Sequence, residues 1–122
     1  MEYWSKLTIR SEECPGVEYT IQRISLGRRI DLGKRVREMS RRVDFLAAGD
    51  TITERVEAGV MQNEIDRLYL EWALASVTGL RIDGEDAGPP LLIECGPEGL
   101  AREVLASIKR ELDLSEDERK NF

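Results

Sequence analysis

The chain has 122 residues, of which 41% are hydrophobic and 34% charged, with a formal net charge of −6 and a sequence pI near 4.8. The length suits one folded domain with its own core, and the composition is that of an ordinary globular protein rather than a disordered one. The negative charge argues against attraction of the whole protein to nucleic acid or to an anionic membrane. We therefore predict a single domain that spans residues 1–122.

Two short segments near the N-terminus alternate between apolar and polar residues. They cover residues 5–11 and 17–22, and a period of two is typical of half-buried strands. Pro15 and Gly16 lie between them and suit a tight turn. This pattern predicts an antiparallel β-hairpin, and Trp4, beside the first strand, is expected to pack.

Two helical stretches follow. Residues 25–48 have apolar positions spaced by four and three, which places them on one side of a helix, and Gly49 suits its end. Thr51 and Glu54 form a capping-box pattern, after which the same spacing continues to about Val77. Two such stripes joined by a short turn predict an antiparallel helical hairpin. The two sets of apolar residues are Leu32, Val36, Met39, Val43 and Leu46, and Met61, Ile65, Leu68, Trp72 and Ala75.

A second short strand pair is predicted after the hairpin. Leu80 and Ile82 alternate with polar residues, the chain turns around Asp83 and Gly84, and residues 91–95 again suggest extended structure. These strands form either a small hairpin or two edge strands of one sheet.

The last element is predicted to be an amphipathic helix. Pro97 suits its first turn, and the apolar stripe consists of Ala101, Leu105, Ile108 and Leu112, helped by Val104. Ser115 and Glu118 repeat the capping-box pattern, which fits one more helical turn or a solvated end. The fold class is therefore α+β, with an N-terminal β-hairpin, an antiparallel helical hairpin, a short second strand pair and a C-terminal helix.

The residues needed for catalysis or metal binding are scarce. The chain has no histidine and two cysteines, Cys14 and Cys95, so it lacks the commonest general base and has too few ligands for a four-coordinate zinc site. Asp83, Glu85 and Asp86 do not have the spacing of a calcium loop and are expected to form a solvated turn. We predict no enzymatic activity, no cofactor and no metal site.

The charges are unevenly distributed along the chain. Residues 1–42 contain 10 basic and 6 acidic residues, a net charge of +4, whereas residues 43–122 contain 8 basic and 18 acidic residues, a net charge of −10. The two halves either attract each other or decorate separate faces, or the basic part binds a partner.

The first predicted helix supplies the candidate partner-binding residues. Arg28, Arg35 and Arg42 are seven positions apart and share a face, with Arg37 and Arg41 beside them. Such a stripe can meet phosphates, bind another protein, or remain a solvated or internally paired face. Glu38 at pairing distance and the absence of interleaved aromatic residues argue against nucleic acid.

The second half of the chain carries a series of short motifs. In order they are "RLYLEWAL", "VTGLRIDGEDAGPPLLIE", "GPEGLAREVLASIKREL" and "LSEDERKN". Together they resemble the small tail assembly chaperones of tailed bacteriophages and prophages, although many relatives have Trp where this chain has Leu80. The matching positions are Val77, Gly79 and Leu80, then Asp83, Gly84 and Pro90, and finally Glu116, Glu118, Lys120 and Asn121.

The resemblance implies a protein that acts by binding. Such chaperones hold the long tape-measure protein during tail assembly, so the expected partner is a tape-measure or other tail protein in the cytoplasm of a bacterial host. Homo-oligomers remain open, and no apolar stretch approaches the roughly 20 residues of a membrane helix. The alternatives are a structural tail or head-tail component of the virion and a nucleic-acid-binding regulator that uses the arginine helix.

Overall fold

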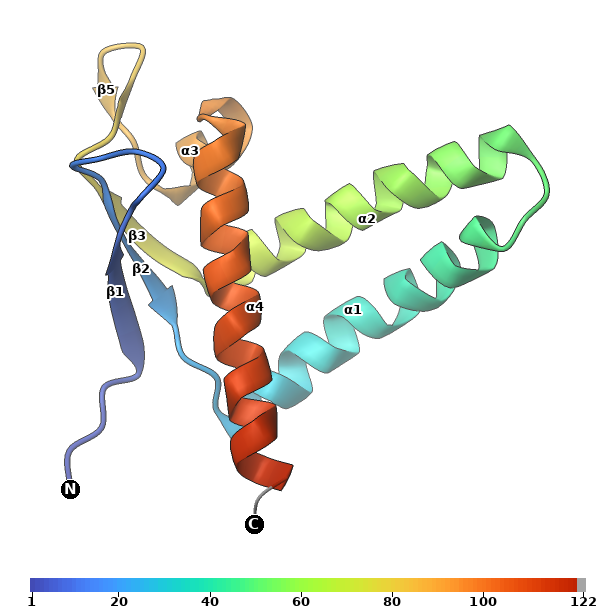
Figure 1. The fold of residues 1–122 in the computed structure, drawn as a ribbon, viewed down its shortest axis with the longest axis horizontal. Helices are drawn as coiled ribbons and strands as arrows, with labels where there is room; N and C mark the ends of the chain where they lie inside the picture. The colour runs from blue at the N-terminus through green and yellow to red at the C-terminus, as the bar shows by residue number, and fades with distance from the viewer. Residues whose placement is uncertain (121–122) are drawn as a thin grey trace. The chain divides into compact units, whose positions relative to one another are not determined.

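The computed structural model describes the backbone of residues 1–120 and the side chains of residues 1–37 and 39–113. Along the chain the elements are β1, β2, α1, α2, β3, β4, β5, α3 and α4 (Figure 1). They divide into two compact units, Met1–Ile24 with Tyr69–Phe122, and Ser25–Leu68. The mixture of helices with antiparallel strands confirms the α+β prediction, and the single domain stays a prediction.

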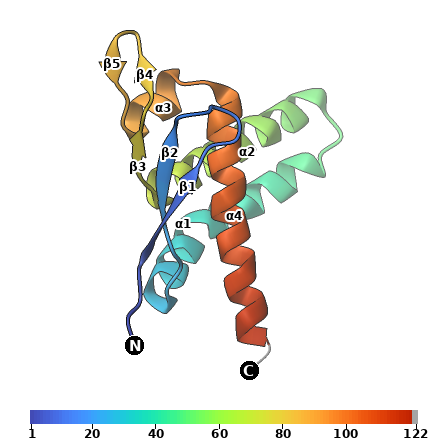
Figure 2. The ribbon, with the colours of Figure 1, turned by 60° about the vertical axis from the view of Figure 1, so that its left-hand side comes forward.

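The first unit contains a three-stranded antiparallel sheet. Strands β1 (Lys6–Arg10) and β2 (Glu18–Gln22) form the predicted hairpin, and Gly16 in its turn has φ +90°, a conformation that favours glycine. Strand β3 (Leu74–Thr78) pairs with the other edge of β2, which gives the order β1-β2-β3 (Figure 2).

The prediction that the second helix reaches Val77 is wrong. Helix α2 spans Ile52–Ala73 and is followed directly by β3. Val77 lies opposite Tyr19, and Leu74 lies opposite Ile21 in the sheet. These two residues of β3 are buried, because the strand completes the second edge of β2 and adds apolar side chains to the core.

The second predicted strand pair is confirmed in its first half only. Strands β4 (Arg81–Ile82) and β5 (Glu85–Asp86) form a two-residue hairpin, and its turn residues Asp83 and Gly84 have φ of +51° and +82°. The segment 91–95, predicted to be extended, belongs instead to helix α3 (Pro89–Cys95). Two prolines at the start of α3 have no N–H to leave unpaired and fix φ near the helical value.

Helix α4 (Glu98–Lys120) supplies most of the other side of the core. Leu100, Val104, Leu105 and Ile108 are at most 5% exposed, so the predicted stripe is confirmed at its centre. Pro97 precedes the helix and accepts the N–H of Ala101 at 3.2 Å through its carbonyl. The helix continues through the tail to Lys120, but the Ser115 and Glu118 side chains of the predicted capping box lie outside the described residues.

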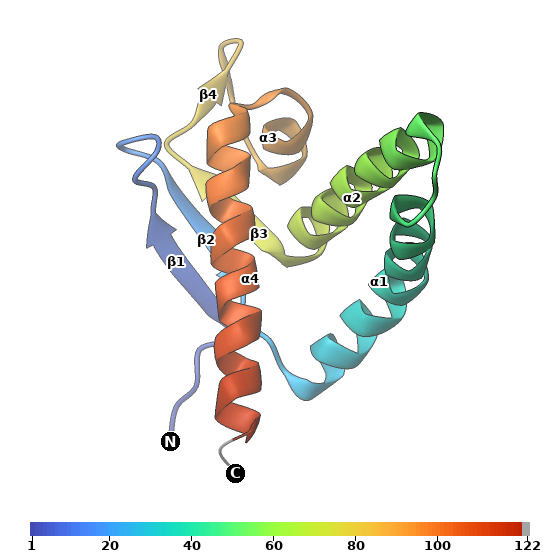
Figure 3. The same ribbon diagram turned by 45° about the vertical axis from the view of Figure 1, so that its right-hand side comes forward.

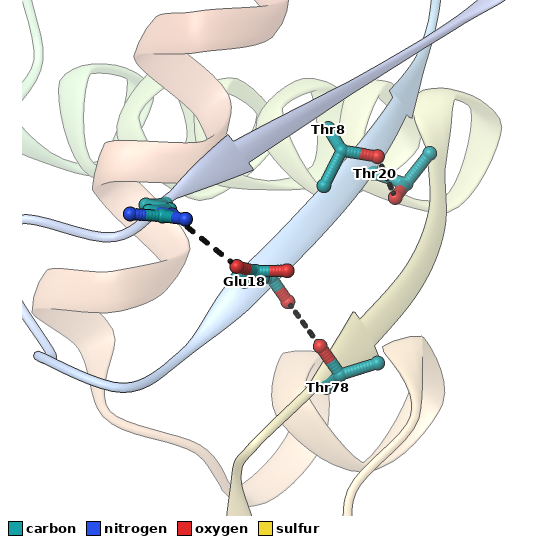
Figure 4. A network of polar contacts seen from close by, with 5 residues as sticks. Thr8, Glu18, Thr20 and Thr78 are labelled. Atoms are coloured by element: carbon teal, nitrogen blue, oxygen red, sulfur yellow. Dashed lines mark hydrogen bonds and ion pairs between the residues drawn. The ribbon is translucent and has the colours of Figure 1, made fainter.

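The face of the sheet opposite the core is polar. Thr8 and Thr20 join their hydroxyls across β1 and β2 at 2.8 Å, and Thr78 donates to the Glu18 carbonyl at 3.5 Å (Figure 4). Trp4, which was expected to pack, is 70% exposed, because β1 begins only at Lys6 and the strand pairing does not enclose the preceding chain.

The second unit contains the predicted helical hairpin. Helices α1 (Leu26–Ala47) and α2 are joined by a short turn (Figure 3). In that turn the Glu54 N–H donates to Thr51 Oγ1 at 3.1 Å, and the Thr51 hydroxyl donates to the Glu54 carboxylate at 2.8 Å. The first contact of the predicted capping box, from the Glu54 N–H to the Thr51 side chain, is therefore present. In the second contact the Glu54 carboxylate accepts from the Thr51 hydroxyl, whereas the sequence pattern predicts the Thr51 backbone N–H as the donor.

Candidate functional site

Helix α1 carries all five arginines singled out from the sequence. Its start is fixed by Ser25, whose hydroxyl accepts the N–H of Arg28 at 3.2 Å and whose carbonyl accepts the N–H of Arg29 at 2.9 Å. At its end the Ala48 N–H donates to the carbonyl of Asp44 at 3.1 Å. A regular helix of 22 residues turns each side chain about 100° from the previous one.

That rotation separates the five arginines into two sides of α1. Arg28, Arg35 and Arg42 lie within about 40° of one another, whereas Arg41 is turned about 100–140° and Arg37 about 140–180° away from them. Arg28 is half-buried, and Arg35 forms an ion pair with Asp31 at 3.0 Å. The structure therefore does not bring all five together on one exposed face.

Another side of α1 carries cations together with exposed apolar side chains. Leu26 and Phe45 are each 76% exposed and Ile30 is 51% exposed. The cations between them are exposed as well, and all these positions fall within an arc of about 100°. We call this set the α1 stripe: Leu26, Ile30, Lys34, Arg37, Arg41 and Phe45.

An open hollow lies over the C-terminal half of the α1 stripe. Among the described residues its lining is positively charged around one aromatic ring, with no carboxylate. The nearby Glu38 side chain lies outside the described part of the chain. The hollow therefore combines a positive potential with apolar surface, which suits a partner that offers both carboxylates and apolar groups. The lining residues are Lys34, Arg37, Arg41, Arg42 and Phe45.

The apolar spacing of the sequence does not point to the three apolar residues of the α1 stripe. Spacing by four and three selects the side that faces a core, and Leu26, Ile30 and Phe45 are apolar residues outside that set. Large apolar residues on the polar side of a predicted helix are the sequence signal that makes them candidates, and the structure shows that they are exposed.

Helix α2 has a second exposed apolar row. Ile52, Val56 and Val60, four positions apart, are 79%, 59% and 53% exposed. Ala58 and Ile65 on another side of the same helix are 6% and 4% exposed. The hairpin therefore shows large apolar side chains to solvent on both of its helices.

The first unit contains a polar cluster centred on Glu103. The hydroxyl of Ser11 donates to Glu103 Oε2 at 2.6 Å, and the N–H groups of Glu12 and Glu13 donate to Oε1 at 2.7 and 3.2 Å. Burial raises the pKa of Glu103, but these hydrogen bonds outweigh it and hold the pKa below its ordinary value. The contacts attach the β1–β2 connection to α4, which is a structural role.

A buried hydroxyl pair lies deeper in the same unit. Tyr19 and Ser107 join their hydroxyls at 2.8 Å, and they are 1% and 7% exposed. Burial raises the pKa of Tyr19 above its ordinary value, although the hydrogen bond between Tyr19 and Ser107 opposes the shift. The pair holds β2 to α4 and is almost completely shielded from solvent.

Potential metal ligands are dispersed in the described part of the chain. Within it, no three potential metal ligands cluster, and the sequence contains no histidine. The acidic turn is held by Arg81, which donates to Asp86 at 3.4 Å and to the Gly84 carbonyl.

A second small hollow combines two carboxylates with apolar groups and is lined by Glu71, Pro89, Pro90, Ile93 and Glu94.

Comparison of the chain with models of known protein families, with curated proteins and with solved structures gave no match. Among the described residues, no helix has the length and apolar character needed to span a membrane. The exposed surface of the helical hairpin is therefore the feature on which a functional interpretation depends.

Proposed function

We propose that this protein is a chaperone of the phage tail assembly type that binds a tape-measure protein during tail assembly and performs no catalysis. The proposal rests on the motif resemblance in the second half of the chain and on the surface of the hairpin. It places the protein in the cytoplasm of a bacterial host, with a long, largely helical partner.

The observation that carries the proposal is the number of large apolar side chains that the hairpin exposes. The six side chains are between 51% and 79% exposed, and several large exposed apolar side chains on one helical hairpin mark a candidate interaction site. A long helical chain with uncovered apolar stripes needs such a surface to stay soluble before the tail tube encloses it. The residues are Leu26, Ile30, Phe45, Ile52, Val56 and Val60.

Coexpression with the long helical protein encoded nearby in the same genome tests this function. The expected result is that the long protein becomes soluble and copurifies with this one, whereas alone it precipitates. A purified protein that leaves the long protein insoluble and never copurifies with it contradicts the proposal.

Two further measurements separate the alternatives. A structural tail or head-tail component remains in finished particles, so purified virions would contain it in stoichiometric amounts. A nucleic-acid-binding regulator would shift duplex DNA at low salt through Arg28, Arg35, Arg41 and Arg42, and the shift would weaken as salt rises.

A further inference from the structure

We infer that the α1 stripe binds an amphipathic helix whose central turns carry carboxylates and whose two ends carry apolar side chains. This inference specifies the binding surface and the partner chemistry of the function proposed above and depends on it. The occupant is a helical segment of a partner protein.

The length of the stripe sets the length of the occupant. Leu26 and Phe45 are 19 residues apart on a regular helix, a distance of about 28 Å at 1.5 Å per residue. A helix of five to six turns laid along α1 reaches both ends of the stripe. Helix-in-groove recognition uses segments of this kind, with apolar anchors on one face.

The order of residues along the stripe determines the chemistry of the occupant. Two exposed apolar residues, Leu26 and Ile30, lie near the N-terminal end, and Phe45 lies near the C-terminal end. Between them stand three exposed cations, Lys34, Arg37 and Arg41. A partner helix with the complementary order places apolar groups against both ends and Asp or Glu side chains against the middle.

Nucleic acid fits this surface less well. Phosphates satisfy the three cations, but they leave the apolar side chains at both ends exposed to water, so the apolar surface contributes nothing to binding. The chain as a whole carries a net charge of −6, which repels a polyanion at long range. A short acidic segment that also brings apolar groups matches both properties of the stripe.

A second copy of the chain is also a poorer match. The exposed apolar row on α2, at Ile52, Val56 and Val60, is followed on the same side of the helix by Asn63 and Arg67. The exposed carboxylates Glu57 and Glu64 are turned about 40–60° from Val60 and do not form a run along the row. The row can bury apolar area against another copy, but it does not neutralise Lys34, Arg37 and Arg41.

Two synthetic peptides test the inference directly. Both are helical 20-residue peptides with leucines on one face of the end turns, and the central turns carry either glutamates or lysines. Binding to the purified full-length protein is measured by fluorescence anisotropy at about 50 mM and 150 mM salt. We expect the glutamate peptide to bind at least tenfold more tightly than the lysine peptide at low salt, with a smaller difference at higher salt because charges are screened.

Paired charge reversals supply the matched control. The double substitution Arg37→Glu/Arg41→Glu changes two cations of the stripe, and Lys6→Glu/Arg55→Glu makes the same change in net charge at exposed positions elsewhere. The stripe variant is expected to bind the glutamate peptide at least tenfold more weakly and to prefer the lysine peptide. The control variant should stay within about twofold of the wild type, and circular dichroism should show the same melting curve for all three proteins.

Any of several outcomes overturns the inference. They are equal binding of the two peptides, failure of the glutamate peptide to bind, equal losses in the two double variants, and tighter binding of a 20-base-pair duplex than of the glutamate peptide. A dimer that dissociates in the stripe variant, measured by light scattering, would likewise assign the surface to a second copy.

Coexpression with the long helical protein distinguishes this inference from the proposed function. If wild type and stripe variant both solubilise the long protein equally, the chaperone function holds and the assignment to α1 is wrong. If the wild type fails to solubilise it while the glutamate peptide still binds the stripe, the proposed function fails and the surface assignment stands.

Discussion

The carboxylate of Glu103 offers a sharp test of how the first unit is held together. It accepts three hydrogen bonds, from the Ser11 hydroxyl and from the N–H groups of Glu12 and Glu13, at 2.6 to 3.2 Å. Replacement by glutamine keeps the size of the side chain, removes the charge and leaves one oxygen where there were two. A hydrogen bond to a charged group contributes about 1.5–3 kcal/mol, and because this site is only partly buried we expect Glu103→Gln to lower the free energy of unfolding by about 2 kcal/mol.

The free energy of unfolding lost in Glu103→Gln should decrease as the pH is lowered. The pKa of Glu103 is lower in the folded protein than its ordinary value, so its contribution is fully present above the unfolded pKa of about 4.3 and disappears as the pH falls through the folded pKa. The difference between wild type and Glu103→Gln is therefore largest at pH 7 and shrinks toward pH 3.

Urea unfolding followed by circular dichroism at pH 7 and pH 3 measures both effects. Glu98→Gln on the same helix is the control, since Glu98 forms only an exposed pair with Arg102 at 3.5 Å and should change stability by less than about 1 kcal/mol. A Glu103→Gln protein as stable as the wild type at pH 7, or a deficit that is unchanged at pH 3, would refute the reasoning.

The remaining predictions concern the same unit and α2. Ser107→Ala should cost about 1–3 kcal/mol because it leaves the buried Tyr19 hydroxyl unpaired, and Tyr19→Phe/Ser107→Ala should cost clearly less than the sum of the two single changes in a urea-unfolding cycle. Gly79→Ala should cost more than about 2 kcal/mol by the same assay, since φ is +79° and a Cβ would lie 2.2 Å from the Gly16 carbonyl oxygen. Gly59→Ala, with open space at its helical position, should stabilise the protein by about 0.5–1 kcal/mol, and a loss there would contradict the regular helix.

Local sequence patterns predict those elements in which the spacing of apolar residues and the residues at the ends or turns indicate the same structure. The β1–β2 hairpin follows from period-two alternation around Pro15 and Gly16. Helix α1 follows from its four-three stripe, with a capping residue, Ser25, just before it and Gly49 after it.

Two stretches of the chain differ from the sequence prediction, each for its own reason. Residues 74–77 continue the apolar spacing of α2 without a break, and only pairing with β2 makes them a strand. Residues 91–95 form a short apolar run whose periodicity does not separate strand from buried helix, and Pro89 and Pro90 at the start of α3 decide it.

The candidate site also has one part that the sequence predicts and one part that it does not. The cations of α1 are visible in the sequence, and rotation by 100° per residue suffices to separate Arg37 and Arg41 from Arg28 and Arg35. The exposure of Leu26 and Phe45 required the structure, because the sequence does not tell which side of a helix remains uncovered by the rest of the chain.

The measurement that tests the account most directly is the soluble amount of the long helical partner when it is expressed with this protein. We expect the partner to remain soluble with the wild type and with Lys6→Glu/Arg55→Glu, and to precipitate with Arg37→Glu/Arg41→Glu or when expressed alone. A partner that precipitates equally in every case would contradict the central claim that this protein acts by binding a long helical chain through α1.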